Sequence, residues 1–431
     1  MKNFIQNLLI QKAKKLLEKN KPIIIAVTGS VGKTSTRNAI AAVLSKKYSV
    51  RSPKDNYNNE FGVPLTILDE KSPGKSAIGW LRILFKKISA EDFPKVFVLE
   101  YGADKPGDIG FLCDIAEPDV SVVTAISPVH AEHFGSIEEL AEEKASIIDK
   151  TKPQGFTVLN IDDQRVMEHV GRARGAVGTY GFKDSAHYRA ENYQIQTKED
   201  FSFQPGEQFC KVIFNVHLSE QNQTTTVELP NHLGRSSVYS ATAAIAVGLH
   251  MGMTIEEVLE GLKSFEPQAG RMRPIPGIKG SLILDDSYNA APASMYFALD
   301  VLHEFHLVDN EKRIAALGFM AELGQYSRSE HIALGHKVVE AGVDLLVTVG
   351  EPALDIRRGA FEAGMDEMHC VHFADSTDAG RYLDSEIHQG DIILVKGSQS
   401  ARMERVSKDL MAEPLMAPDL LVRQSEKWIN E

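Results

Sequence analysis

The sequence predicts an α/β protein with two parallel-sheet domains and a small antiparallel sheet attached to the first. Short, continuously apolar runs alternate with helical stretches, beginning at residues 22–28, 96–99 and 120–125 and resuming at residue 282. Runs of this kind are typical of strands buried on both faces of a parallel sheet. The chain has 431 residues, and a single hydrophobic core stops growing well below that size, so more than one domain is expected.

The composition excludes several classes of protein. Hydrophobic residues make up 43% and charged residues 25% of the chain, without repeats or low-complexity tracts, which argues against a disordered protein or a solenoid. A formal net charge of -12 disfavours a nucleic acid partner, because binding to phosphates needs clustered Lys and Arg. Cys113, Cys210 and Cys370 are far apart, which argues against a disulfide scaffold or a zinc site and fits a reducing cytoplasm.

Residues 1–21 are expected to form a basic amphipathic helix, with Phe4, Leu9 and Ala13 on its apolar face. The segment is neither a signal peptide nor a membrane span, because polar residues interrupt its apolar ones and no cleavage site follows. Residues 77–88 have the same basic amphipathic character. Two interpretations stay open. Either both helices pack on the protein's own core, the commoner outcome, or they lie on the inner surface of the membrane, making a cytoplasmic protein peripheral to it.

The first domain begins with a strand at residues 22–28 that ends in a glycine loop and is followed by a helix over residues 34–44. From residue 155 to residue 229 the pattern changes to alternating apolar and polar residues, which favours a small antiparallel sheet. A further helix is expected over residues 238–248.

Proline and glycine cluster in residues 265–276, a composition typical of an interdomain hinge. We therefore assign residues 22–269 to a central domain and residues 270–431 to a C-terminal domain. The C-terminal domain has the strand and helix alternation of a Rossmann-like fold, but no G-x-G-x-x-G sequence opens it, so a dinucleotide site is not indicated. Its expected strands are at residues 282–284, 314–317, 345–349 and 392–395.

The loop after the first strand is the strongest functional motif. In a phosphate-binding loop, backbone N–H groups and a helix N-terminus point at the anion, a lysine neutralises it, and a Ser or Thr holds magnesium. Val27 occupies the position of the first glycine in the general motif, so this loop is the variant T-G-x-x-G-K-T. The flanking strand and helix favour ATP binding over a chance match. The expected ATP contacts are Thr28, Gly29, Ser30, Val31, Gly32, Lys33, Thr34 and Ser35.

Beyond this loop the sequence resembles the Mur ligase family, and within it most closely the branch that joins D-alanyl-D-alanine to a UDP-muramoyl tripeptide. The resemblance implies a central P-loop ATPase-like domain, a Rossmann-like C-terminal domain, ATP, and two Mg²⁺ sites. It also implies an amide ligase that adds D-alanyl-D-alanine or a similar dipeptide to a muramoyl-peptide cell-wall precursor through an acyl phosphate. The matching segments, in order, are residues 58–66, 100–109, 130–136, 160–163, 270–271, 285–292, 318–324 and 396–404.

Three residues of the central domain are candidates for metal binding and catalysis together with Thr34 and Lys33. Glu100 ends an apolar strand, where a carboxylate needs water or a cation, so it is a Mg²⁺ candidate, with a local ion pair as the alternative. His130 follows another apolar strand, and the resemblance implies that it binds a second Mg²⁺. The resemblance also implies that Lys144 becomes carbamylated and helps to hold metal, although the pattern alone favours a solvated helix lysine.

The C-terminal domain supplies the remaining candidates. Arg271 lies in the expected hinge, where its guanidinium could reach the ATP phosphates or the acyl phosphate. Asp286 and Asn289 follow a strand and correspond to residues that meet the nucleotide in the family, although an aspartate here could also cap the following turn. For substrate binding, the candidates are Asn59, Lys396 and Ser398.

The sequence departs from the family pattern in ways that leave the acceptor open. Only about 25 residues precede the loop, so the usual N-terminal UDP-sugar-binding domain of this branch is not expected here. The family's His-Asn pair near adenine falls on Ser236 and Ser237, and Phe319 replaces a common aspartate. The alternative functions are a folylpolyglutamate-type or other amino-acid-adding ligase, and a noncatalytic ATP-binding subunit.

Overall fold

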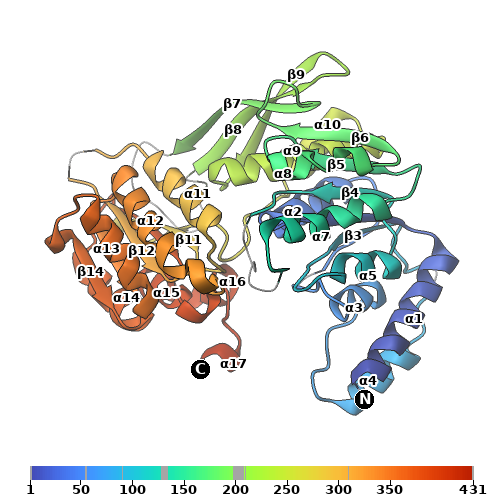
Figure 1. Cartoon of the computed structure of the whole chain (residues 1–431), viewed down its shortest axis with the longest axis horizontal. Coiled ribbons are helices and arrows are strands. Elements are labelled where there is room, and N and C mark those ends of the chain that lie inside the picture. The colour runs from blue at the N-terminus through green and yellow to red at the C-terminus, as the bar shows by residue number, and fades with distance from the viewer. Residues whose placement is uncertain are drawn as a thin grey trace. The chain divides into compact units, whose positions relative to one another are not determined.

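The computed structural model describes residues 2–53, 56–89, 91–127, 134–197, 208, 210–308 and 310–429 (Figure 1). The chain divides into two compact units. The first unit contains residues 1–192, 214–227 and 238–265, and the second contains residues 193–213, 228–237 and 266–431. Each unit contains a mainly parallel sheet with helices, which confirms the predicted α/β class.

The first unit is built on six parallel strands, and the same sheet continues into three further strands whose residues are divided between the two units. The order of strands is β2-β3-β1-β4-β5-β6-β7-β8-β9. Their bounds are β1 Ile23–Thr28, β2 Val50–Arg51, β3 Val96–Glu100, β4 Val120–Val123, β5 Phe156–Asn160, β6 Ala176–Gly181, β7 Tyr188–Thr197, β8 Cys210–Leu218 and β9 Gln223–Pro230.

Helices and connecting segments cover this sheet, as the alternating sequence pattern predicts. The helix after the glycine loop, predicted over residues 34–44, is α2. The bounds are α1 Lys2–Asn20, α2 Lys33–Leu44, α3 Gly62–Leu68, α4 Ala77–Phe85, α5 Asp108–Ile115, α7 Ile137–Lys150, α8 Gln164–Met167, α9 Gly234–His250 and α10 Ile255–Leu262.

The register of the central strands brings the glycine loop and Glu100 to one edge of the sheet. Val27 of β1 lies opposite Glu100 of β3, and Thr28 lies opposite Val123 of β4. The strands are parallel, so all three carboxyl ends meet at the same edge. This is the edge where open α/β sheets bind their ligands.

The antiparallel part is smaller than the sequence predicts, because β5, β6 and β7 form parallel pairs in the sheet. Polar residues in β5 hide its buried character: the hydroxyl of Thr157 accepts a hydrogen bond from Ser121 of β4 at 3.3 Å, so a polar residue is satisfied inside the sheet. The neighbouring strands β8 and β9 are joined by a short turn and form the expected hairpin.

The second unit has a six-stranded sheet in the order β10-β11-β15-β12-β13-β14, parallel except for the pair β10 and β11. The sequence predicts four of these strands, but not the two at the edges, β10 and β14. The strands are β10 Arg273–Pro276, β11 Leu282–Asp286, β12 Arg313–Gly318, β13 Leu345–Val349, β14 Cys370–Phe373 and β15 Ile392–Lys396. The helices are α11 Pro292–His303, α12 Ser327–Glu340, α13 Leu354–Glu362, α14 Ser376–Glu386, α15 Glu404–Leu410, α16 Ala417–Leu420 and α17 Glu426–Ile429.

The N-terminal helix α1 packs against its own unit, which is the first of the two interpretations of its sequence. Leu9 and Ala13 are fully buried, Ala13 in the core that includes β1 and β3. Helix α4 is different, because Ile83 is its one buried residue. Within the described part of the chain, no helix combines the length and apolarity needed to cross a membrane.

Helix α10 packs so closely on α2 that the contact leaves no room for a side chain at Gly261. A Cβ atom at this position would lie 2.5 Å from the Cα of Val43 and 3.0 Å from its carbonyl oxygen, both backbone atoms that cannot move aside cheaply. The contact therefore fixes α2, the helix that begins at the glycine loop, against α10.

We expect Gly261→Ala to lower the free energy of unfolding by about 1–3 kcal/mol, because the two helices must separate to admit the methyl group. Urea denaturation followed by circular dichroism measures this. The matched control is Gly110→Ala in α5, where no atom lies within 4 Å of the added methyl group. That substitution should stabilise the protein by about 0.5–1 kcal/mol. Equal effects of the two substitutions would contradict the packing argument.

Candidate active site

The glycine loop between β1 and α2 is tied to the end of β4. Gly29 has φ 143° and Gly32 has φ 83°, conformations that side chains disfavour. A Cβ atom at Gly29 would lie 2.1 Å from the hydroxyl of Thr124. That hydroxyl donates to the carbonyl oxygen of Val31 at 2.6 Å, and the amide of Ser30 donates to Ala125 at 2.6 Å. The loop therefore has one defined shape, set by glycines and by strand β4.

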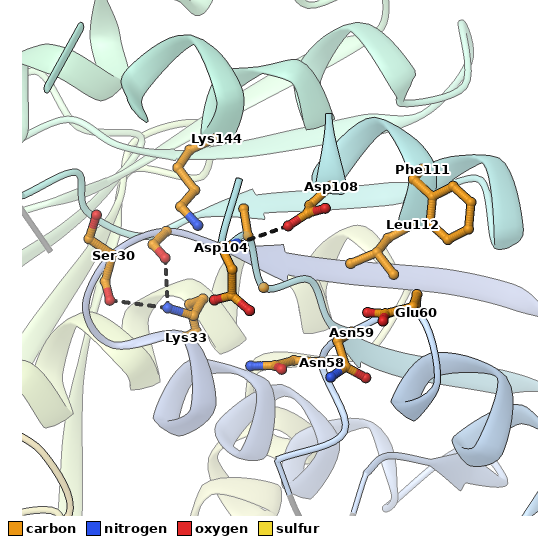
Figure 2. A pocket seen from close by; sticks show the side chains of 13 residues that line it. Ser30, Lys33, Asn58, Asn59, Glu60, Asp104, Asp108, Phe111, Leu112 and Lys144 are labelled. Carbon is orange, nitrogen blue, oxygen red and sulfur yellow. Dashed lines mark hydrogen bonds between the residues drawn. The ribbon is translucent and has the colours of Figure 1, made fainter. Parts of the chain in front are cut away.

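Lys33, the first residue of α2, folds back across the loop. Its Nζ donates to the carbonyl oxygens of Gly29 at 2.7 Å and Ser30 at 3.1 Å (Figure 2). This arrangement holds the ammonium over the loop, at the N-terminus of a helix whose dipole also favours an anion. The next residue, Thr34, is buried within the first unit.

Glu100 lies beside this loop and is paired with a residue that the sequence motifs did not single out. Its Oε2 is 3.3 Å from Nη1 of Arg37, and its Oε1 accepts from Nδ2 of Asn58 at 3.1 Å. Arg37 lies three residues after Thr34 on α2, and therefore on the same face. The alternative that Glu100 pairs locally thus holds, while its metal role stays a prediction. The available signal was a lone arginine in a helix of small and apolar residues.

Lys144 is not the solvated lysine that its sequence pattern favours: its residue is only 3% exposed. Figure 2 shows its side chain and that of Lys33 extending toward the same space. Burial lowers the pKa of Lys144 to about 7, and the positive charge of Lys33 acts in the same direction. The carboxylates that oppose this shift belong to Glu143, Asp104 and Asp108. At neutral pH a large share of Lys144 is therefore a neutral, nucleophilic amine.

Backbone N–H groups orient two of the carboxylates near Lys144, those of Glu143 and Asp108. Glu143 accepts from the amides of Gly107 and Ile109, each at 2.7 Å, and so caps the start of α5. Asp108 accepts from the amides of Asp104 and Lys105, both at 3.0 Å. These hydrogen bonds hold carboxylate groups close to a buried amine.

Thirteen residues of the first unit line one pocket around these groups (Figure 2). Asn59 lies in its wall and caps α3, because its Oδ1 accepts from the amide of Gly62 at 2.9 Å. The sequence predicts five of the lining residues: Gly29, Ser30, Lys33, Asn59 and Lys144. Most of the remaining eight lie in segments that carry the family resemblance, but the sequence assigns a role to none of them: Asn58, Glu60, Gly102, Ala103, Asp104, Asp108, Phe111 and Leu112.

Two oxygen donors beside the glycine loop suit a hard cation bound together with phosphates. Among the residues that the structure describes, no three His, Cys, Asp or Glu side chains gather closely enough to hold a metal ion by themselves. The hydroxyl of Thr34 and the carboxylate of Glu100 are oxygen donors, and Mg²⁺ usually takes one or two carboxylates and completes its shell with water and substrate phosphates. The residues present therefore fit Mg²⁺ bound with ATP. His130 lies outside the described residues.

The second unit gathers the predicted C-terminal residues at the ends of β11 and β15. Nζ of Lys396 donates to Oδ2 of Asp286 at 2.6 Å and to the carbonyl oxygen of Asn289 at 3.0 Å. Arg271 lies over the ring of Tyr288, with its guanidinium carbon 4.2 Å from the ring centre. The contacts thus bring together three predicted residues, Lys396, Asp286 and Asn289. The fourth, Arg271, lies over Tyr288, the residue just before Asn289.

Two neighbours of this cluster face inward. Ser398 is buried, and its hydroxyl accepts from the amide of Ala321 at 2.7 Å, so it supports the adjoining loop. Asp285 is fully buried and accepts from Ser407 and from the amide of Gly270. Burial raises the pKa of Asp285 to about 6. Asp285 therefore serves the interior, while Asp286 pairs with Lys396.

Residues 27–248 match the Mur ligase middle domain, and residues 270–399 match the Mur ligase glutamate ligase domain. The first match alone spans more than half of the chain. The chain belongs to the Mur ligase family.

Individual proteins agree with this assignment. The chain is 29% identical to the UDP-N-acetylmuramoyl-tripeptide D-alanyl-D-alanine ligase of Bacillus subtilis, over 94% of this chain and 80% of that protein. It is similar to the crystal structure of MurF from Acinetobacter baumannii, with a TM-score of 0.76 and 26% identity over 94% of this chain and 80% of that one. MurF from Thermotoga maritima in complex with ADP gives a TM-score of 0.76 and 25% identity, over 94% and 83%. The predicted family is confirmed.

The two departures of this Mur ligase from the family pattern fall on residues with structural contacts. The hydroxyl of Ser237 donates to the carbonyl oxygen of Gly234 at 2.8 Å within α9. Phe319 packs against the hydrophobic core on both faces of the second sheet. Each of these two side chains therefore has a contact within its own part of the protein.

The lowered pKa of Lys144 predicts a pH dependence of stability in metal-free protein. In the unfolded chain this lysine keeps its proton up to about pH 10.5, the ordinary lysine value, whereas the folded protein releases it near pH 7. Between these values the unfolded state binds more protons, so this residue makes the free energy of unfolding rise with pH. We expect Lys144→Met to flatten that rise in urea denaturation from pH 7 to pH 9 with a chelator present.

The control for this measurement is Lys150→Met on the same helix. Lys150 is largely exposed, and its hydrogen bond to Asp114 raises its pKa instead of lowering it. Lys150→Met should therefore leave the rise in the free energy of unfolding between pH 7 and pH 9 unchanged. Identical slopes for Lys144→Met and the unsubstituted protein would show that the amine is protonated at neutral pH.

Proposed function

We propose that this Mur ligase uses ATP to activate a carboxylate of a muramoyl-peptide cell-wall precursor and joins it to D-alanyl-D-alanine or a similar dipeptide. The observation that carries the proposal is the convergence of two lysines, Lys33 and Lys144, with the carboxylate of Asp108 in one pocket beside the glycine loop. The relatives' names supply the substrate class, because the UDP-N-acetylmuramoyl-tripeptide D-alanyl-D-alanine ligase of Bacillus subtilis is similar to 94% of this chain.

The ATP phosphates would bind at the glycine loop. Gly29 and Gly32 let the backbone adopt the shape of the loop without a side chain in the way, and Lys33 already lies across it. Backbone N–H groups at the start of α2 add the positive end of the helix dipole. We assign Mg²⁺ to Thr34 and Glu100, where it would offset the charge of the phosphates.

The proposed reaction forms one amide bond at the expense of one phosphoanhydride bond. An oxygen of the substrate carboxylate attacks the γ-phosphorus of ATP, the bond to ADP breaks, and an acyl phosphate results. The dipeptide's amine then attacks the carbonyl carbon, loses a proton, and expels inorganic phosphate with the electron pair of the broken bond. Negative charge develops in both steps, so the chain's main task is to place cations and hydrogen-bond donors around it.

Lys144 has the properties that carbamylation requires. The reaction joins a neutral amine to carbon dioxide and releases a proton, and the lowered pKa provides that amine near pH 7. The product would be an anion at a place where a cation is poorly tolerated. We propose that carbamylated Lys144 and His130 hold the second Mg²⁺. Both residues would then be catalytic.

In the second unit we propose that Arg271, Asp286 and Asn289 meet the nucleotide and that Lys396 and Ser398 serve the incoming amine. The ion pair between the buried ammonium of Lys396 and the carboxylate of Asp286 supports a shared role, since it holds the two side chains together at the ends of neighbouring strands. Asn59 is assigned to the substrate from the first unit, because it lines the same pocket as Lys33.

The direct test is phosphate release from ATP with defined substrates. We expect release that needs both a UDP-muramoyl tripeptide and D-alanyl-D-alanine, and a product whose mass shows one new amide bond. Lys33→Ala should lower kcat/KM by at least a hundredfold, because the phosphates lose their bound cation. Lys46→Ala, an exposed lysine just after α2, should leave it unchanged. Release that requires glutamate and a folate, with none from the muramoyl peptide, would assign the second ligase class.

A second test separates the charge of Lys144 from its carbamylation. Lys144→Arg keeps a cation but cannot form the carbamate, so we expect kcat to fall at least a hundredfold. The variant should still unfold cooperatively in urea, which shows that the protein is folded. Lys150→Arg on the same helix should retain full activity. Full activity of Lys144→Arg would show that the carbamate has no role, even if the ligase reaction itself is confirmed.

A further inference from the structure

Residues 71–89, here called the basic segment, have an unusual charge for this protein. They contain Lys71, Lys75, Arg82, Lys86 and Lys87 and no Asp or Glu, within a chain whose formal net charge is -12. Helix α4, Ala77–Phe85, lies in the middle of this segment. A local concentration of cations on an acidic protein calls for an explanation beyond solubility, which the acidic surface already provides.

Helix α4 has two apolar faces, and one of them points to solvent. Ile83 packs inward against Leu9, Leu65 and Leu68 of the same unit. Ile78, Leu81 and Phe85 are 81%, 53% and 81% exposed, and Phe4 on the neighbouring α1 is 68% exposed. At about 100° per residue, Ile78, Leu81 and Phe85 lie within an arc of about 60° on the helix. They form a continuous outward stripe instead of scattered exposed residues.

The helix is firmly held, so this exposure is a feature of the folded protein. Nζ of Lys12 on α1 donates to the carbonyl oxygens of Ile83 at 2.7 Å, Leu84 at 3.0 Å and Lys86 at 2.6 Å, which closes the C-terminal end of α4. Ser76 caps the other end by accepting from the amide of Gly79 at 3.1 Å. Figure 1 shows α1 and α4 side by side at one end of the first unit.

The cations lie next to the stripe. Arg82 is about 40° from Ile78 around the helix, and Lys75, Lys86 and Lys87 flank its two ends. Lys86 pairs with Glu70 at 2.6 Å. Within the described part of the chain, Lys75, Arg82 and Lys87 form no ion pair. An apolar stripe bordered by cations, of which only Lys86 among these four has a carboxylate partner in the described residues, matches a surface that is apolar inside and anionic outside.

We infer that the basic segment, together with Phe4, is a docking surface for an anionic lipid bilayer. Ile78, Leu81 and Phe85 enter the boundary between headgroups and acyl chains, and the flanking cations meet the lipid phosphates. The inference narrows the membrane interpretation of the sequence, because Leu9 and Ala13 of α1 are buried inside the protein and only Phe4 remains outside. It is independent of the ligase activity, since no residue of α4 lines the pocket described above.

The experiment is co-sedimentation of the whole protein with vesicles. We expect binding to vesicles of phosphatidylcholine mixed with phosphatidylglycerol, weak binding to phosphatidylcholine alone, and loss of binding as salt increases. Ile78→Ser with Phe85→Ser should weaken binding at least tenfold, because the inserted apolar surface is lost. Arg82→Glu with Lys87→Glu should weaken it at least tenfold on the anionic vesicles and remove most of the salt dependence.

Matched controls use the same changes elsewhere on the surface. Phe297→Ser with Leu415→Ser removes two apolar side chains that are 51% and 94% exposed, and Lys150→Glu with Lys263→Glu reverses two exposed lysines. All four double variants should keep the native circular dichroism, and the two controls should bind vesicles as the unsubstituted protein does.

Three outcomes would overturn the inference. The first is no binding to anionic vesicles at low salt. The second is binding that the α4 variants and the controls change equally. The third is a dimer in sedimentation equilibrium that Ile78→Ser with Phe85→Ser dissociates while vesicles fail to bind, which would make the stripe an interface between two copies of the chain.

Discussion

The site in the first unit depends on how buried charge is satisfied at the carboxyl edge of its sheet. The register of β1 and β3 places Glu100 beside the residue that leads into the glycine loop. A carboxylate buried there would be costly alone, so the Arg37 guanidinium and the Asn58 amide compensate it. Because Arg37 belongs to α2, the same pair fixes that helix against the strand. The position of Lys33 and Thr34, one turn earlier on α2, follows from this contact.

The buried charge of Lys144, in contrast, has no close ion pair among the described contacts. It is as buried as Glu100, but its surroundings include Lys33, and the pKa of the amine falls to about 7 instead of being held up by a close ion pair. Two of the three carboxylates around it, those of Glu143 and Asp108, accept hydrogen bonds from backbone amides at the start of α5, which limits how far they can move toward it. An apolar residue here would carry no such cost of burial, so the buried amine supports the catalytic role proposed for Lys144.

What the sequence predicts well is local, and what it misses depends on tertiary contacts. The loop at residues 28–35 is predictable because strand, glycines and helix are contiguous and the motif has a physical reason for each residue. The burial of Lys144 is not, because its helix shows the usual acidic and basic neighbours and only packing reveals which face is covered. Arg37 is missed for the same reason. Strand β14, Cys370–Phe373, is missed because it is short and only partly buried at the sheet's edge.

The lysines of this protein show why residue type alone gives so little. Lys12 closes the end of α4, Lys33 bridges two carbonyl oxygens of its own loop, and Lys396 pairs with Asp286. Each of these ammonium groups donates to oxygens at short distance. Burial lowers the pKa of Lys12 as well, and it lowers the pKa of Lys144 to about 7. In the sequence the glycine-loop motif singles out Lys33, whereas Lys12 and Lys144 stand in helical segments among ordinary charged and apolar neighbours. Their roles differ because the fold supplies each with a different set of oxygens and a different degree of burial, so the surroundings of each charge determine its function.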